Sequence, residues 1–185
     1  MRCVVYIATS LDGFIADKDG GLDWLQSIDA PEGDDLGFSR FQESVDAVVM
    51  GRVTFESVVG FGIGWPYSVP GIILSSSLRT APAGFDKHVS FTGGSPEEVL
   101  AFANELGHAN LYLDGGRTIQ DFLRADLVDE MILTEIPVLL GGGARLFDSL
   151  PNQLAFELVE SETLVGQAVK RHYRRKRDKP PTNQS

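Results

Sequence analysis

The chain has 185 residues, which suits one domain with a full hydrophobic core and is too short for two ordinary domains. Its formal net charge of −10 argues against a nucleic-acid-binding protein, because phosphates favour a basic face. No apolar stretch approaches the roughly 20 residues that cross a bilayer, and the N-terminus lacks a signal-peptide pattern. The single cysteine, Cys3, excludes an intrachain disulfide, so we expect a cytoplasmic protein that contacts neither membrane nor nucleic acid.

Apolar runs rich in Val, Ile and Leu alternate with helical patterns along the chain. These runs predict buried strands over residues 4–8, 47–51, 71–75, 111–115 and 131–140. Helices are predicted over residues 36–45, 53–59, 95–106 and 117–125. The third helix has a strong N-terminal signature, because Ser95 precedes Pro96 and two glutamates follow.

The last two segments, residues 156–164 and 167–175, flank Val165 and Gly166 in the manner of an antiparallel hairpin. Strands that alternate with helices predict an α/β domain with a mostly parallel sheet, finished here by antiparallel strands. We expect this domain to cover residues 1–176 and the basic residues 177–185 to form a disordered tail.

The histidines carry no sign of a metal site. His88, His108 and His172 are far apart, and none has a ligand-like partner three or four residues away. A zinc site requires clustered Cys and His at close spacing. The sequence therefore predicts no metal.

In parallel sheets, ligands bind where strands end and loops lead into helices. After the second predicted strand, Gly51 permits a sharp turn, and Arg52 and Thr54 follow at the start of a helix. A helix start stabilises an anion, and the Arg52 guanidinium suits a phosphate. Alternatively, Thr54 only caps the helix and Arg52 is a surface charge.

The next two junctions have similar chemistry. Ser75 to Ser77 follow the third strand, where they either close a turn or, with Arg79, contact a ribose phosphate. Gly115 and Gly116 follow the fourth strand and allow a ligand close to the main chain, with Thr118 in a second anion cradle. Each feature alone is also typical of a plain turn. The three junctions together predict a dinucleotide across one sheet edge.

Three motifs carry a family resemblance: "MGRVTFES" (50–57), "IILSSS" (72–77) and "LYLDGGRTIQDFL" (111–123). In this order and spacing they resemble the dihydrofolate reductase superfamily over nearly the whole chain. Asp114 and "LVDEMILTEIPVLLGGGARLF" (127–147) are similar to the branch that contains the C-terminal reductase domain of bacterial riboflavin biosynthesis. The resemblance implies a three-layer α/β/α fold, NADPH as cofactor and a homodimer formed through the late strands.

The resemblance also implies a cofactor site. Arg52 and Ser76 would bind the 2′-phosphate of NADPH, and Leu74 and Ser75 would lie at the adenosine end. The pyrophosphate would contact Gly51, Thr54, Gly115, Gly116, Arg117 and Thr118, with a cis bond between Gly115 and Gly116. The nicotinamide would lie beside Ala8, under a loop in which Ile15 and Trp24 hold the matching positions.

Three residues are candidates for the substrate side. Asp35 and Thr134 match the acid and the threonine that hold the pterin in dihydrofolate reductases, although Asp34 or Asp35 equally suits a helix cap. Asp114 matches the acid that the riboflavin branch places at its substrate, although it also suits a cap of the following helix. Asp12 is either a turn former or a loop anchor.

The resemblance implies an NADPH-dependent reductase that transfers hydride to a heterocyclic or ribosylaminopyrimidine-type substrate. The alternatives are a dihydrofolate reductase that acts on a pterin and a non-catalytic NADP-binding protein. With one cysteine, the chain lacks the zinc deaminase motif that riboflavin proteins usually carry, so the bifunctional activity is excluded. An unusual insert, residues 60–71, is expected to shape either the pocket or an interface.

Overall fold

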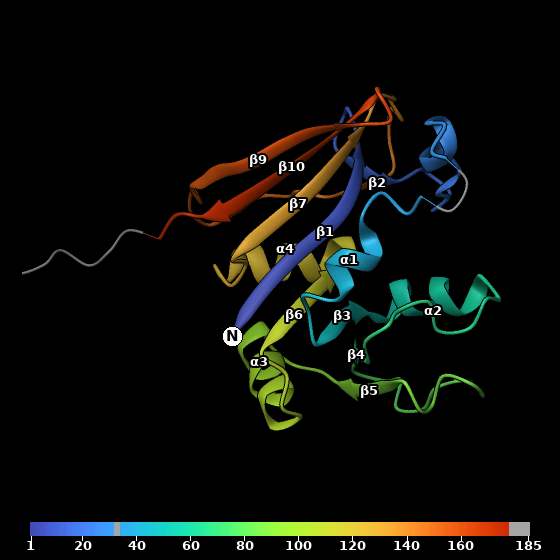
Figure 1. The fold of residues 1–185 in the computed structure, drawn as a ribbon. Coiled ribbons are helices and arrows are strands. Elements are labelled where there is room, and N and C mark those ends of the chain that lie inside the picture. Colours follow the sequence, from blue (N-terminus) through green and yellow to red (C-terminus); the bar gives the residue numbers. More distant parts are fainter. Residues whose placement is uncertain (32–33, 178–185) are drawn as a thin grey trace, which may run out of the picture.

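One sheet of eight strands runs through the computed structural model, which describes residues 1–31 and 34–177 (Figure 1). Six strands are parallel, and the last two form an antiparallel hairpin at one edge. Across the sheet they follow the order β5 (Val89–Thr92), β4 (Gly71–Leu74), β3 (Ala47–Gly51), β6 (Asn110–Asp114), β1 (Arg2–Ser10), β7 (Glu130–Ile136), β10 (Ala168–Arg175) and β9 (Phe156–Leu164).

Helices cover both faces of the sheet. Successive residues of a strand point to opposite sides, so each face of the sheet contributes to a separate core cluster. In β1, Val4 packs in one core cluster with α1 (Phe38–Gln42) and α2 (Arg52–Gly60). Its neighbour Val5 packs in another cluster with α3 (Pro96–Glu105) and α4 (Gly116–Arg124). Both valines are fully buried. The predicted α/β/α layers and mostly parallel sheet are therefore confirmed.

Several predicted boundaries are wrong. β7 ends at Ile136 and does not reach residue 140, because Pro137 lacks the N–H that a strand interior needs. α1 covers only Phe38–Gln42, which is half of the predicted helix. The short strand β5, whose residues are only partly buried, was not predicted. A second, two-stranded sheet of β2 (Phe14–Ala16) and β8 (Ala144–Arg145) was also not predicted.

Ion pairs connect the end of β10 and the residues just after it to the rest of the domain. Arg175 lies 2.7 Å from Asp126, and Arg177 lies 2.5 Å from Asp129. Arg177, the first residue of the predicted tail, is thus paired with a residue of the domain. The rest of the predicted tail, residues 178–185, lies outside the described residues. No helix in the described part is long and apolar enough to cross a bilayer.

Candidate functional site

The three predicted junctions meet at one edge of the sheet. Gly51 of β3 is in register with Leu74 of β4, and Met50 is in register with Asp114 of β6. The loops that follow these strands therefore begin next to one another. This shared edge is the location that ligands favour in parallel sheets.

The glycines of these loops lie against threonines from the opposite junction. Gly51 lies next to Thr118, since a β-carbon on Gly51 would be 3.5 Å from Thr118 Oγ1. A β-carbon on Gly115 would overlap Thr54 Oγ1, and Gly115 also has a φ of +85°. This conformation favours glycine strongly. The starts of α2 and α4 are thereby brought into direct contact.

Within the described part of the chain, α2 and α4 begin at this edge without a capping side chain. In contrast, α3 begins with a full capping box, in which Ser95 and Glu98 bind each other's backbone N–H groups. Thr54 therefore does not cap α2, which was one alternative. The free N–H groups and positive dipole ends of α2 and α4 favour a bound anion.

A cavity of about 560 Å³, which we call the α2–α4 cavity, opens beside these two helix starts. Its wall is largely apolar and includes Leu22, Leu25, Val53 and Phe61, which the sequence did not single out as site residues. A mainly apolar cavity with a few polar groups is typical of a small-molecule site. Seven of the predicted residues line it: Ala8, Ile15, Thr54, Asp114, Gly115, Gly116 and Arg117.

Asp114 is the one acid among the described residues that line this cavity. Its Oδ1 accepts the N–H of Gly115 at 2.8 Å, and its Oδ2 accepts the hydroxyl of Tyr67 at 2.8 Å. Burial raises the pKa of Asp114, and the hydroxyls of Tyr67 and Tyr112 and the N–H of Gly115 offset only part of that rise. The alternative that Asp114 caps α4 is not supported, because its bond goes to Gly115, the N-cap residue itself.

Tyr67 belongs to the 60–71 insert, which therefore shapes the cavity. Nothing in the spacing of the insert singles out Tyr67 from Trp65 or Phe61. Its contact with Asp114 joins positions 47 residues apart and depends on the path of the loop between α2 and β4.

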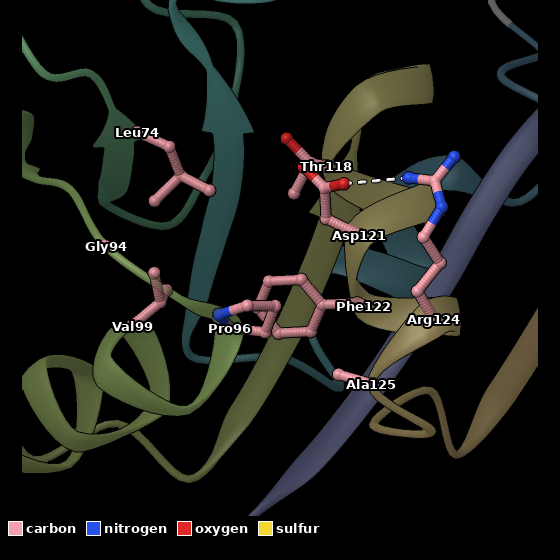
Figure 2. Close-up of a pocket in the computed structure, with 9 residues that line it drawn as sticks. All are labelled: Leu74, Gly94, Pro96, Val99, Thr118, Asp121, Phe122, Arg124 and Ala125. Carbon is pink, nitrogen blue, oxygen red and sulfur yellow. Dashed lines mark hydrogen bonds and ion pairs between the residues drawn. The ribbon is translucent and has the colours of Figure 1, made fainter. Parts of the chain in front are cut away.

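A second cavity, of about 330 Å³, lies between α3 and α4, and we call it the α3–α4 cavity (Figure 2). Leu74 and Thr118, both predicted site residues, line it. Figure 2 shows Asp121 and Arg124 of α4 joined across one side, at 2.8 Å. Thr118 directly follows Gly116 and Arg117, which line the α2–α4 cavity. The start of α4 therefore separates the two cavities.

The predicted phosphate ligands lie on neighbouring strand ends. Arg52 is half exposed at the start of α2, where its guanidinium pairs with Glu56 at 3.0 Å. Ser76 is exposed after β4, whereas Ser75 is buried and its Oγ accepts the N–H of Leu78 at 2.8 Å. Arg79 donates to the carbonyl of Ser75 at 2.7 Å. Ser75 and Arg79 thus close the turn, and Arg52 and Ser76 remain accessible.

Asp35 lies outside both cavities. It is exposed, and its two oxygens accept the N–H groups of Gly37 at 2.9 Å and Ser39 at 2.7 Å. The bonds from Ser39 lower the pKa of Asp35. This arrangement supports the helix-cap alternative. Asp34 lines a separate depression of about 640 Å³ between α1 and β10.

Two further predicted residues, one buried and one partly buried, lie near the α2–α4 cavity but do not line it. Thr134 of β7 is 6% exposed and is in register with Ala8 of β1. Trp24, in a short 3₁₀ helix (Asp23–Ser27), packs with Ala8 and Ile28 in a small core cluster. Trp24 Nε1 is buried without a hydrogen-bond partner in the described part of the protein.

A comparison with known protein families shows the family of this chain. Residues 3–170 match the family model described as the RibD C-terminal domain. The chain belongs to the RibD C-terminal domain family. This family contains reductases, as the resemblance of the three junction motifs implied.

Solved structures share the fold of this chain. A "putative riboflavin biosynthesis protein" of Shewanella sp. PV-4 is 45% identical, with a TM-score of 0.92 over 96% of this chain and 100% of that one. The diaminohydroxyphosphoribosylaminopyrimidine deaminase/5-amino-6-(5-phosphoribosylamino)uracil reductase of Thermotoga maritima is 16% identical, with a TM-score of 0.73. There the match covers 94% of this chain and 56% of that protein.

The fold is that of dihydrofolate reductase. The Enterococcus faecalis dihydrofolate reductase, solved with NADP(H) and RAB-propyl, is 23% identical, with a TM-score of 0.65. That match covers 94% of this chain and 96% of that one. At this identity, the likeness establishes the shared fold alone.

One expectation taken from the resemblance is wrong for this RibD C-terminal domain. The bond between Gly115 and Gly116 is trans, and the described residues contain no cis peptide bond. Gly115 has φ 85° and ψ 137°, a conformation that turns the chain from β6 into α4 with a trans bond.

Proposed function

We propose that this protein is an NADPH-dependent reductase of a ribosylaminopyrimidine-type substrate, similar to 5-amino-6-(5-phosphoribosylamino)uracil reductase. The observation that carries this proposal is the pair of cavities on either side of the start of α4. Two uncapped helix starts and three close-packed glycines lie between them. This arrangement suits a dinucleotide, with one end in each cavity and its phosphates at the helix starts.

The residues present fit the cofactor. Arg52 and Ser76 are accessible to a 2′-phosphate, and Leu74 lines the α3–α4 cavity, where the adenosine would lie. The nicotinamide would occupy the α2–α4 cavity beside Ala8 and Ile15. Bound there, NADPH supplies a hydride to the acceptor. The apolar wall of this cavity excludes water from the acceptor, and Asp114 is available to hold it.

The choice of substrate rests on Asp114. It lines the α2–α4 cavity at the position where the riboflavin branch has its acid, whereas Asp35, the acid of the pterin alternative, is exposed and bound to a helix start. The Thermotoga maritima relative, named as a 5-amino-6-(5-phosphoribosylamino)uracil reductase, supports the same choice.

The resemblance also favours a cytoplasmic homodimer. On β9, at the edge of the sheet, Leu158 is 57% exposed and Val159 is 43% exposed. Apolar side chains on an edge strand are suited to a subunit interface. Analytical ultracentrifugation of the purified protein tests this part of the proposal, which a monomer at micromolar concentration would contradict.

Titration with NADPH and NADH, followed by nicotinamide fluorescence, tests the cofactor site. We expect a clear preference for NADPH, because Arg52 offers a charge-assisted contact to the 2′-phosphate. Arg52→Ala should weaken NADPH binding roughly 10- to 100-fold and leave NADH binding unchanged. Arg174→Ala is the matched control, because Arg174 is an exposed arginine on β10. Equal and weak binding of both nucleotides would refute the phosphate assignment.

The substrate is tested by oxidation of NADPH in the presence of 5-amino-6-(5-phosphoribosylamino)uracil or dihydrofolate. The proposal predicts turnover of the first compound. Turnover of dihydrofolate alone would favour the pterin alternative. Tight NADPH binding without turnover of either compound would favour a non-catalytic NADP-binding protein.

A further inference from the structure

Tyr67 is the one phenol among the described residues that line the α2–α4 cavity, and it is bonded to the one acid there. Its hydroxyl donates to Oδ2 of Asp114 at 2.8 Å, and Oδ1 of the same carboxyl group accepts the Gly115 N–H. The Gly115 N–H therefore fixes the Asp114 end of the pair. The Tyr67 end lies at the cavity.

The loop that carries Tyr67 is held in place on both sides. Trp65 Nε1 donates to the carbonyl of Val69 at 2.9 Å, and the Ser68 N–H donates to Oε1 of Gln42 at 2.7 Å. The Trp65 and Tyr67 rings lie 4.9 Å apart. These contacts fix the phenol ring, so the Tyr67 hydroxyl is preorganised toward Asp114 and the cavity.

The surroundings of the pair favour its protonated form. Burial raises the pKa of both Asp114 and Tyr67. Tyr112, on the same strand as Asp114, is buried and donates to the carbonyl of Tyr6 at 3.0 Å. Two arginines, Arg117 and Arg145, line the same cavity.

Both arginines have other partners. Arg117 pairs with Asp121 at 2.9 Å and is 82% exposed, and Arg145 lies over the ring of Phe14 at 4.7 Å. Neither of them is bonded to Asp114, whose carboxyl group accepts from Tyr67 and from the backbone of Gly115 and also has its pKa lowered by the nearby Tyr112 hydroxyl.

We propose that Tyr67 and Asp114 form a two-residue proton relay that protonates the acceptor atom of the substrate during reduction. The proposal rests on the reductase function proposed above. The acceptor carbon of a C=N or C=O group gains a hydride, and the π electrons of that bond move to its nitrogen or oxygen. That atom takes the proton of Tyr67. When Asp114 is protonated, its hydroxyl donates to the Tyr67 oxygen, and the Tyr67 O–H is then free to donate to the acceptor atom. Asp114 passes its own proton to the Tyr67 oxygen, becomes a carboxylate and regains a proton from the solvent. Tyr67 is thus a catalytic residue that contacts the substrate.

The first test requires no substrate. Titration of the ¹³C-labelled aspartate carboxyl groups by NMR, with Asp114→Asn to identify the signal, measures the pKa of Asp114. We expect a value above the ordinary one of about 3.9 in the wild-type protein. Tyr67→Phe should raise it further, because the hydrogen bond from Tyr67 stabilises the carboxylate. An ordinary or lower pKa, or the same pKa in both proteins, overturns the relay.

The second test uses the acceptor that the wild-type protein reduces with NADPH. Tyr67→Phe should lower kcat about 100- to 1,000-fold, within the range of general acid catalysis, and leave the Kd for NADPH within twofold. The wild-type kcat should fall as pH rises through the pKa of Asp114 measured by NMR. Tyr173→Phe is the control, because Tyr173 lies on β10 outside the cavity and should change neither value.

The outcomes separate the relay from the reductase function. A wild-type kcat in Tyr67→Phe refutes the relay and leaves the reductase function intact. Loss of NADPH binding in Tyr67→Phe also refutes it, because a proton donor to the substrate does not hold the cofactor. If the wild-type protein reduces neither acceptor, the reductase function fails and the relay fails with it, whatever the NMR titration shows.

Discussion

The hydroxyl oxygen of Thr54 occupies the space that a β-carbon on Gly115 would need. This contact joins the starts of α2 and α4, and Gly115 also has a backbone conformation that is almost exclusive to glycine. Gly115→Ala should therefore destabilise the fold by more than about 2 kcal/mol and weaken NADPH binding. Urea unfolding and nicotinamide fluorescence measure the two effects.

Gly107→Ala is the matched control for this substitution. Gly107 has a φ of +83°, close to that of Gly115, but open space lies where its β-carbon would be. Gly107→Ala should lower the free energy of unfolding only by the cost of a left-handed backbone conformation for alanine, about 1 kcal/mol. It should retain NADPH binding. Equal losses of stability in the two variants would show that the contact with Thr54 has no cost.

Asp12 joins two loops and should make the fold sensitive to acid. Its carboxylate accepts the Ser10 hydroxyl at 2.7 Å and the Gly141 N–H at 2.7 Å. These bonds, that of Ser10 above all, lower the pKa of Asp12 to about 2. The carboxylate thus stabilises the fold above its ordinary pKa of about 3.9, and this contribution is lost as pH falls toward 2.

Asp12→Asn should consequently lower the urea midpoint at neutral pH, and the difference from the wild-type protein should narrow between about pH 4 and pH 2. Asp86→Asn, at an exposed position, serves as the control and should follow the wild-type curve. A difference that stays constant over this pH range would contradict the role of the ionised Asp12 carboxyl group.

Cys3 should be unreactive until the protein unfolds. It is 1% exposed, and burial, with a smaller contribution from Asp129, raises the pKa of its thiol to about 12. Almost no reactive thiolate is present at pH 8. Ellman's reagent should label Cys3 only at the rate of unfolding, and NADPH should slow that rate if it binds the native state.

Ser149→Cys provides the comparison, because Ser149 is exposed. The thiol introduced at this exposed position should react within seconds, and Cys3 should react at the slow rate of unfolding. Immediate labelling of Cys3 in the native wild-type protein would disprove its burial.

The strand ends of the site were predictable because they follow local rules. Val48, Val49 and Met50 mark a buried strand by composition, and Gly51 and Arg52 mark its exit into a helix. The fold class and the strand ends that form the candidate site depend on such local signals. The strand order and the register of Gly51 with Leu74 were not predicted from the sequence and are seen only in the structure.

Other parts of the site depend on contacts between distant residues. Tyr67 reaches Asp114 through the path of an irregular loop, which no periodicity encodes. For Asp35, the sequence left a cap and a substrate ligand equally open, because both use a carboxylate near a helix start. Only the exposure of its side chain and its bond to Ser39 favour the cap.

The small sheet of β2 and β8 links the loop after β1 to the loop after β7. Phe14 pairs with Arg145, Leu146 N–H donates to the Gly13 carbonyl at 3.0 Å, and Asp12 binds Gly141. Residues about 130 positions apart therefore share one set of hydrogen bonds over the α2–α4 cavity. Substitutions in the two segments are energetically coupled, so the effects of double variants will not equal the sum of the single ones. We expect that a change in the length of one segment would disturb the other and alter this wall of the cavity.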